Sequence, residues 1–383
     1  MSELSPGDPR HALLLQAALA AGNEAMAAYE TWRLDVERDR PDSIAWRILP
    51  LAGWNLESTG LDFEDLPHLK QLHRESWARN QYLFAATAPA VEALERASIP
   101  TLLLKGAALA LTVYPSPGLR PMADVDVLVP ERLAAPARRV LAEAGWRPNP
   151  REPERRLAHL HAQEFVREVD GEPAALDLHW RALWEGREPA GDDAWWESAE
   201  PLCAGGFQSR VLAPADQLVQ LCAHAARWSP QPACYAAADV VMLLRARGGR
   251  MDWERVAHQA AKRRLVLAVV TALAALTERF GAPVPPATLY SLTRMPVILR
   301  ERAEFHARQL PSALSRGLFL HWCDLAREAP HASAARRLGR FPSYLREVWN
   351  LEHLWQVPVE ATRKAWSRRP GPRGAGGPAW GRG

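Results

Sequence analysis

The chain has 383 residues, of which 48% are hydrophobic and 24% are charged, and its formal net charge is +3. This composition excludes a disordered chain and suits a folded protein of two or three domains. Residues 366–383 hold four arginines and no acid, so removing them takes the net charge from +3 to −1. A near-neutral folded part argues against a nucleic-acid partner, because binding to a phosphate backbone needs a basic surface.

Cysteine usage and hydropathy indicate a cytoplasmic protein. Cys203, Cys222, Cys234 and Cys323 form no CxxC pair and no zinc-finger spacing, so we expect reduced thiols. The apolar run 265–276 is too short to span a bilayer and is flanked by charged residues. It therefore predicts a buried helix, and no membrane partner is expected.

Residues 1–98 are predicted to form an N-terminal helical region. Apolar residues recur at spacings of three and four, and breaks are expected at Pro41-Asp42 and at 58–60. A long helix is predicted over 66–96, with Pro89 as a point of interruption.

Residues 99–205 are predicted to form a small core of mixed strands and helices. A strand in TLLLKG is followed by a short helix, a Pro-rich loop and a strand in MADVDVLVP. A helix over 133–145 comes next. A hairpin then joins QEFVREV to ALDLHW through Asp170-Gly171, a strong turn signal.

Residues 206–365 are predicted to form a C-terminal helical domain, and 366–383 a disordered Gly/Pro/Arg tail. The expected helices cover 216–228, 236–245, 253–262, 266–280, 318–327 and 341–355. The predicted fold class is therefore α+β, with a small mixed sheet flanked by N-terminal and C-terminal helical regions.

Asp124 and Asp126 lie two residues apart on the predicted strand in MADVDVLVP. Side chains at this spacing share one face of a strand, with Cα atoms roughly 6.5 Å apart. Two carboxylates on one face repel each other unless a cation neutralises them, and hard oxygen ligands suit Mg²⁺. The pair therefore predicts a metal site of the kind that holds two ions.

Asp177 in ALDLHW is the best candidate for a third metal-binding carboxylate. It lies on a hairpin strand that could neighbour the first strand, and His179 shares its face. Such a carboxylate can act both as a metal ligand and as the base for an incoming hydroxyl.

Lys105 and Gly106 are predicted to bind nucleotide phosphates. They stand where a strand ends and a helix begins, a position at which backbone amides favour an anion. Arg120, four residues before Asp124, could neutralise phosphate charge with its bidentate guanidinium.

Three segments, LLLKGAAL, YPSPGLRPMADVDVLVP and LDLHW, resemble a bacterial family of uncharacterised nucleotidyltransferases within the DNA polymerase β-like superfamily. ILPLAGWNL upstream and PADQLVQLCAHAARW, DVVMLL and MDW downstream extend the resemblance over most of 45–280. It implies a polymerase β-like core, Mg²⁺ bound by the DxD acids, and transfer of a nucleoside monophosphate from an NTP.

Under this resemblance, Asp124 and Asp126 match the metal acids and Asp177 matches the third. Lys105-Gly106 stands where the wider superfamily has a Gly-Ser turn. Ala107 follows here, so no hydroxyl is available to hold the phosphate.

Each of these residues also has a structural interpretation. The acids could be salt-bridged or hairpin-edge residues, Lys105 a solvated lysine and Arg120 a partner of Asp124. A histidine such as His179 more often belongs to the core or the rim of a fold, and His159, His161 and Glu164 lack a regular zinc-binding spacing. His224 and Asp239, on predicted C-terminal helices, could contact the nucleotide or tie two helices together.

We therefore predict an enzyme that moves an NMP, expected to be AMP, from an NTP to a hydroxyl of a small molecule or protein. It would use two Mg²⁺ ions, for which Mn²⁺ could substitute, and release pyrophosphate. The alternatives are an inactive nucleotide-binding protein and a helical scaffold, either of them working with a protein partner from a biosynthetic gene cluster.

Overall fold

The structure is a computed structural model. It describes residues 9–34, 42–60, 63–150, 157–185, 191–227, 232–310 and 314–367. The predicted disordered tail lies outside the described residues from position 368 onward.

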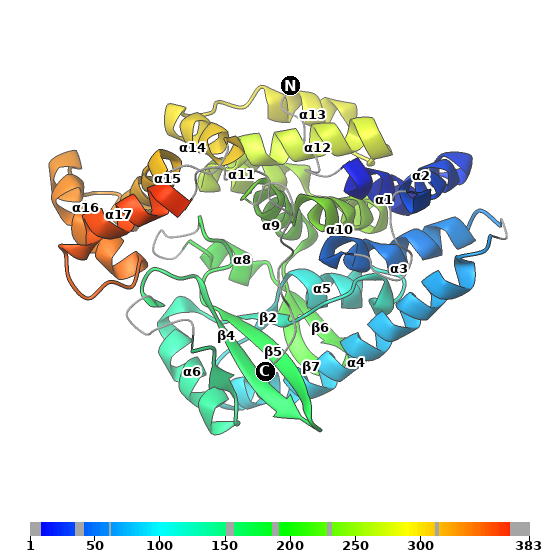
Figure 1. The fold of residues 1–383 in the computed structure, drawn as a ribbon, viewed down its shortest axis with the longest axis horizontal. Helices are drawn as coiled ribbons and strands as arrows, with labels where there is room; N and C mark the ends of the chain where they lie inside the picture. The colour runs from blue at the N-terminus through cyan, green and yellow to red at the C-terminus, as the bar shows by residue number, and fades with distance from the viewer. Residues whose placement is uncertain are drawn as a thin grey trace.

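One mixed sheet forms the centre of the described chain (Figure 1). Its strands are β1 (Leu102–Leu103), β2 (Val125–Leu128), β3 (Arg147–Pro148), β4 (Ala162–Val169), β5 (Glu172–His179), β6 (Glu200–Ala204) and β7 (Phe207–Val211). The strand order is β3-β4-β5-β2-β1-β7-β6, so β2 and β5 are neighbours although they lie far apart in the sequence.

β2 and β5 run parallel, whereas β2 and β1 run antiparallel. The register places Asp126 opposite Asp177 and Leu128 opposite His179. β4 and β5 form the predicted hairpin. Its turn residues Asp170 and Gly171 have φ values of 53° and 81°, which suit a tight two-residue turn between twisted strands.

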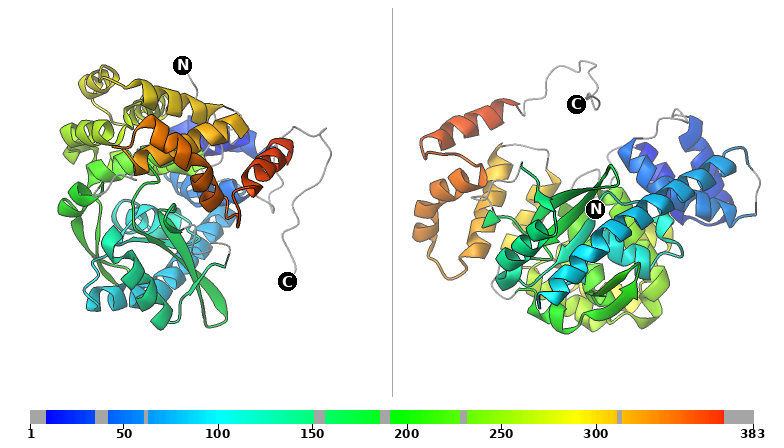
Figure 2. Two further views of the ribbon diagram at one scale, coloured as in Figure 1. Left: turned by 90° about the vertical axis from the view of Figure 1, so that its left-hand side faces the viewer. Right: turned by 90° about the horizontal axis from the view of Figure 1, so that it is seen from below.

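Side chains along β2 and β5 point alternately to the two faces of the sheet, and each face packs against its own hydrophobic layer. Val125, Val127, Leu176 and Leu178 pack on one side with α4 (Leu66–Arg96) and α6 (Ala134–Glu143). Figure 2 shows α4 crossing this face of the sheet when the molecule is seen from below. The residues between them along the strands point to the opposite face, which is where the acids lie.

Helices from both ends of the chain cover the opposite face. The N-terminal helices are α1 (Pro9–Leu19), α2 (Gly22–Leu34) and α3 (Ser43–Glu57). They share a hydrophobic cluster with α9 (Pro214–Arg227), α10 (Pro232–Arg247), α11 (Trp253–Arg263) and α12 (Val266–Phe280). The backbone amides of Ile44 and Ala45 donate to the Asp42 side chain, which caps α3 at its beginning.

The short helix α8 (Asp193–Glu197) lies between β5 and β6 in the chain and buries Trp195 in the same cluster. The helices that follow α12 are α13 (Pro286–Thr293), α14 (Leu299–Gln309), α15 (Leu314–Glu328), α16 (Ala334–Val348) and α17 (Gln356–Ser367). α15 to α17 have a small hydrophobic cluster of their own. They lie on the opposite side of the molecule from α1 to α3 (Figures 1 and 2).

The structure confirms the α+β fold class, with a small mixed sheet between helical regions. The long helix predicted over 66–96 is α4, which continues through Pro89 without interruption. The helices predicted between 216 and 280 correspond to α9 through α12, although Trp228 lies outside the described residues. The helix predicted over 341–355 is wrong in its boundaries, because Asn350 adopts φ 56° after the end of α16.

Sequence reasoning missed the β6–β7 hairpin. Gly205 and Gly206, with φ values of 61° and 83°, form its turn, and β7 pairs in parallel with β1. The sheet therefore continues past residue 205, the predicted end of the core, to Val211. The division of the chain into domains stays a prediction.

No helix among the described residues is long and apolar enough to cross a membrane.

Candidate active site

Parallel pairing of β2 with β5 assembles an acid cluster on the helix-covered face of the sheet. His179 Nε2 lies 2.8 Å from Asp126 Oδ1 and 3.1 Å from Asp177 Oδ2. The Asp126 side chain is 9% exposed and that of His179 is fully buried, while Asp177 is 24% exposed. The three side chains therefore meet in a largely dehydrated place that opens to solvent on the Asp177 side.

Lys105 brings a cation into this cluster. Its Nζ lies 2.6 Å from Asp126 Oδ1 and 3.4 Å from His179 Nε2. Burial acts to lower the pKa of Lys105, but the charges of Asp126 and Asp177 outweigh it and raise the pKa. The residue also begins α5 (Lys105–Thr112) with φ 44°, an uncommon backbone conformation for a side chain other than glycine.

The two acids of the DxD motif differ in their surroundings. Burial acts to raise the pKa of Asp126, but Lys105 and His179 hold it well below its usual range. Burial, together with the charges of Asp126 and Asp177, raises the pKa of Asp124 to about 6. Asp124 precedes β2 by one residue rather than lying on it, and the charges of Lys105 and Arg47 lower its pKa by less than burial and the two acids raise it.

Asp126, Asp177 and His179 could hold a metal ion. One ligand atom from each lies within 4.8 Å of the other two, and no other such group occurs in the described part of the chain. The Lys105 ammonium already supplies a positive charge at Asp126 Oδ1, where a metal ion would otherwise supply it. The donor set of two carboxylates and one imidazole fits a divalent ion, and Asp124 is not part of this set.

From the sequence, His179 was more often expected to be a core or rim histidine than a functional one, but its Nε2 faces both acids. The Nδ1 atom is buried without a hydrogen-bond partner among the described residues. The His161 ring packs against His179 with 5.2 Å between ring centroids. The alternation of ALDLHW, which puts His179 on the Asp177 face, was the signal that pointed to this position.

Gly106 is required by close packing. A Cβ atom at this position would lie 2.9 Å from Met122 Sδ and 3.7 Å from Arg120 Nη1. The loop that leads into β2 therefore presses directly against the beginning of α5. The predicted contact of Gly106 with a phosphate stays a prediction.

The structure places Arg120 in a buried network instead of in the acid cluster. Its Nε and Nη2 donate to Asp239 Oδ1 and Oδ2 at 2.7 and 2.9 Å, and the Tyr114 hydroxyl donates to Asp239 Oδ1 at 2.7 Å. Asn80 of α4 donates to the backbone carbonyls of Pro117 and Arg120. Asp239 of α10 thus anchors the loop before Asp124, and phosphate binding by Arg120 stays a prediction.

His159 connects the core to the C-terminal helices. Its two ring nitrogens lie 3.2 Å from Glu328 Oε1 of α15 and 2.8 Å from Glu347 Oε2 of α16. The carboxylates are on opposite edges of the ring, so the arrangement is a bridge and does not suit a single metal ion. The HxHxxE motif accordingly gives no zinc cluster in the described residues.

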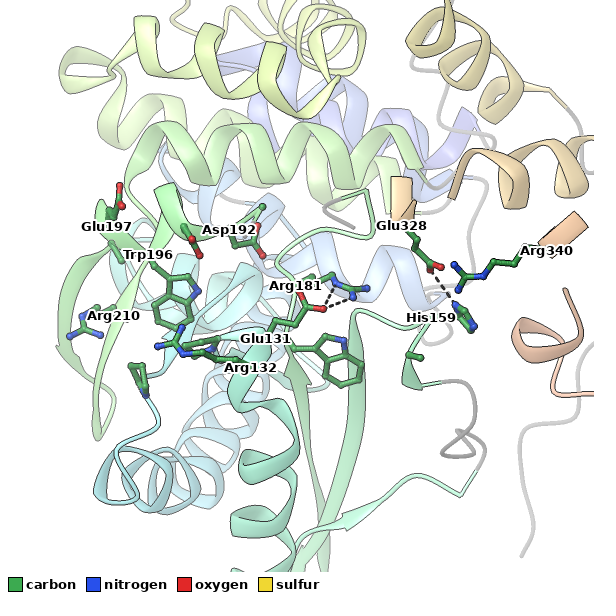
Figure 3. A pocket seen from close by; sticks show the side chains of 17 residues that line it. Glu131, Arg132, His159, Arg181, Asp192, Trp196, Glu197, Arg210, Glu328 and Arg340 are labelled. Atoms are coloured by element: carbon green, nitrogen blue, oxygen red, sulfur yellow. Dashed lines mark hydrogen bonds and ion pairs between the residues drawn. The ribbon is translucent and has the colours of Figure 1, made fainter. Parts of the chain in front are cut away.

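A cleft of about 1120 Å³ lies near the carboxyl ends of β2 and β5. Figure 3 shows Trp196, Arg132 and Arg210 at one end of it and His159, Glu328 and Arg340 at the other. The Glu131–Arg181 ion pair lies between these ends. Trp180, which directly follows His179, lines the cleft, whereas no residue of the acid cluster is among its lining residues.

The chain can be compared with known proteins by sequence and by structure. The comparison with curated proteins found no match. The chain is similar to a solved antigenic nucleotidyltransferase-like protein from Paracoccidioides brasiliensis, with 12% sequence identity and a TM-score of 0.35 over 55% of this chain and 96% of that chain. A TM-score this low carries no argument about the present chain.

A family described as uncharacterised nucleotidyltransferase matches residues 43–281, more than half of the chain. The matched range runs from the beginning of α3 through the sheet to the end of α12. It therefore includes every residue of the acid cluster and both members of the Arg120–Asp239 pair. The chain belongs to this family of nucleotidyltransferases.

Proposed function

We propose that this protein transfers a nucleoside monophosphate, with AMP expected, from an NTP to a hydroxyl group of an acceptor and releases pyrophosphate. The observation that carries the proposal is the register of β2 with β5, which sets Asp126 opposite Asp177. The third ligand atom of the cluster is supplied by His179. Family membership supports the reaction class.

Asp126, Asp177 and His179 would hold a divalent ion, with Mg²⁺ expected and Mn²⁺ as a substitute. When bound, such an ion neutralises phosphate charge and lowers the pKa of a hydroxyl bound to it. We assign Asp124 to the same machinery as an additional acid on the nucleotide side, where a second ion would be held. The raised pKa of Asp124 fits an acid whose charge lacks a fixed counter-ion.

The transfer forms one bond and breaks another. The acceptor oxygen attacks the α-phosphorus of the NTP, and the bond from that phosphorus to the bridging oxygen of pyrophosphate breaks. Asp177, the most exposed ligand of the cluster, accepts the hydroxyl proton. Lys105 neutralises charge on the phosphates, and its position at the beginning of α5 adds the favourable end of the helix dipole.

The cleft at the ends of β2 and β5 is the proposed acceptor site. Its lining combines Trp180 and Trp196 with several charged side chains, which suits an acceptor with polar groups. Asp192, in its wall, pairs with Arg263 at 3.0 Å and is fixed in place. The predicted alternatives, a small molecule and a protein side chain, both fit a cleft of this volume.

A second candidate function rests on Lys105. Its ammonium already neutralises Asp126, so a nucleotide could bind without turnover. The protein would then sense nucleotides and act with a protein partner. Tight binding of an NTP, with no pyrophosphate released in the presence of any acceptor, would favour this function.

The decisive experiment measures the melting temperature with ATP, GTP, CTP and UTP, each with and without Mg²⁺. We expect one nucleotide to raise the melting temperature only when Mg²⁺ is present, because a ligand that binds the native state stabilises it. Asp126→Asn and Asp177→Asn should lose this rise. Asp170→Asn, in the hairpin turn far from the cluster, is the matched control and should keep it. No rise with any nucleotide in wild type would sink the proposal.

A further inference from the structure

Arg47 of α3 lies beside the candidate active site although it comes from the N-terminal helical region. Its guanidinium carbon is 4.9 Å from the centre of the Tyr235 ring on α10. Among the described residues, Arg47 forms no ion pair with a carboxylate, unlike Arg120 and Lys105. It is therefore a half-buried cation that no carboxylate of the described ranges contacts directly.

A short chain of contacts connects Arg47 to the predicted phosphate-binding turn. Tyr235 is flanked by two guanidinium groups, since the Arg120 carbon lies 5.6 Å from the same ring centre. Arg120 Nη1 in turn would lie 3.7 Å from a Cβ atom at Gly106. Arg47, Tyr235 and the beginning of α5 thus lie in one neighbourhood.

Long-range charge also links Arg47 and Lys105 to Tyr235. Both positive charges act to lower the pKa of Tyr235, which burial raises. Tyr235, in ring contact with Arg47, is therefore close enough to Lys105 to sense its charge.

We propose that Arg47 binds the terminal phosphates of the nucleoside triphosphate and that Tyr235 holds its guanidinium in place. This inference rests on the proposed function and goes beyond it by naming a residue from outside the sheet. A triphosphate carries more negative charge than Lys105 alone can balance. A planar guanidinium suits bidentate contact with phosphate oxygens.

With Arg47 in this role, α3 contributes directly to nucleotide binding. The family match begins at residue 43, where α3 itself begins, and leaves α1 and α2 outside. Tyr235 comes from α10, which follows the strands in the chain, whereas α3 precedes them. The site is therefore completed by helices from both parts of the chain. α3 and α10 share one hydrophobic cluster, which fixes Arg47 and Tyr235 relative to each other.

The test is calorimetric titration of wild type and variants with Mg²⁺ and the NTP that wild type binds best. The monophosphate of the same base serves as the second probe. We expect Arg47→Ala to weaken NTP binding by ten-fold or more and to leave monophosphate binding unchanged, because only the NTP reaches Arg47. Arg47→Gln, which keeps the length of the side chain, should behave likewise if the alanine variant fails to fold.

Arg96→Ala is the matched control, because it removes a positive charge from an exposed side chain at the end of α4. It should leave both affinities unchanged. Equal NTP affinity in wild type and Arg47 variants, or equal loss for both probes, would overturn the role of Arg47 alone. Failure of wild type to bind any NTP with Mg²⁺ would instead overturn the proposed function together with this inference.

Discussion

Two groups of buried charges lie on the same face of the sheet and differ in how completely they are balanced. In the Arg120–Asp239 network, both carboxylate oxygens accept from the guanidinium, and Tyr114 adds a third hydrogen bond. In the acid cluster, the charges of Asp126, Asp177 and the nearby Asp124 all act on one ammonium group, that of Lys105. The first group is a complete ion pair, whereas the second has more carboxylates than lysine or arginine side chains to balance them.

This difference in charge balance distinguishes buried charges that hold the structure together from buried charges that serve the function. A buried pair with all hydrogen bonds made holds two segments in one geometry and needs no ligand. A buried cluster with excess negative charge is disfavoured, so its acids either bind a cation or take up protons, and such clusters are common at functional sites. Substitutions in the two groups should accordingly affect different quantities.

The largest effect is expected for Asp126→Asn, which removes the carboxylate shared by Lys105 and His179. We expect nucleotide transfer to fall about a thousandfold, since a metal ligand contributes several kcal/mol to transition-state stabilisation. The rate of pyrophosphate release measures this, with Asp170→Asn as the control. Turnover within a few-fold of wild type would mean that Asp126 is not a functional ligand.

Asp239→Asn should instead reduce stability more than it reduces nucleotide transfer. It leaves the Arg120 guanidinium buried without a balancing charge, so we expect the free energy of unfolding to fall by about 3 kcal/mol. Chemical denaturation measures the loss. The double variant Asp239→Asn/Arg120→Met removes the stranded charge and should recover part of it. A loss below about 1 kcal/mol would show that this network does not anchor the loop.

His159 is a third buried charge, and its contribution to stability should depend on pH. Burial acts to lower its pKa, but hydrogen bonds to Glu328 and Glu347 outweigh it and raise the pKa above 6.5. The folded state therefore binds the proton more tightly, and the stabilisation is complete below pH 6.5 and is lost as pH rises through the raised pKa.

We expect unfolding free energies at pH 6 and pH 8 to differ by about 1 kcal/mol more in wild type than in His159→Gln. Denaturation curves at the two pH values measure the difference. His353→Gln, at an exposed histidine, is the control and should keep the pH dependence of wild type. Equal pH dependence in His159→Gln and wild type would contradict a charged bridge between the core and α15–α16.

The smallest effect is expected for the stability of Asp124→Asn. The raised pKa of Asp124 indicates that burial and the neighbouring acids disfavour its charged form, so a neutral side chain should raise the melting temperature. The same variant should reduce nucleotide transfer. A decrease in melting temperature would show instead that Asp124 has a structural partner in solution.

Local sequence patterns predicted the long helix α4 and the Asp170-Gly171 hairpin, and alternation placed Asp177 and His179 on one face of their strand. These features rest on interactions between residues close in sequence, or on alternation, which fixes the face to which each side chain points. The β6–β7 hairpin was missed because its strands are short and its alternation is weak. Helix ends such as that at Asn350 depend on one backbone conformation and are also difficult to predict.

The sequence by itself determined the fold class, the family and the acids that share one face of the sheet. Only the tertiary structure decided which cation each acid meets. Lys105 reaches Asp126, whereas Arg120 turns to Asp239 more than a hundred residues away. Arg47 enters the neighbourhood of Asp124 only because α3 packs over the sheet beside α10. Such pairings depend on three-dimensional distance, since electrostatic interaction falls with separation in space and not along the chain.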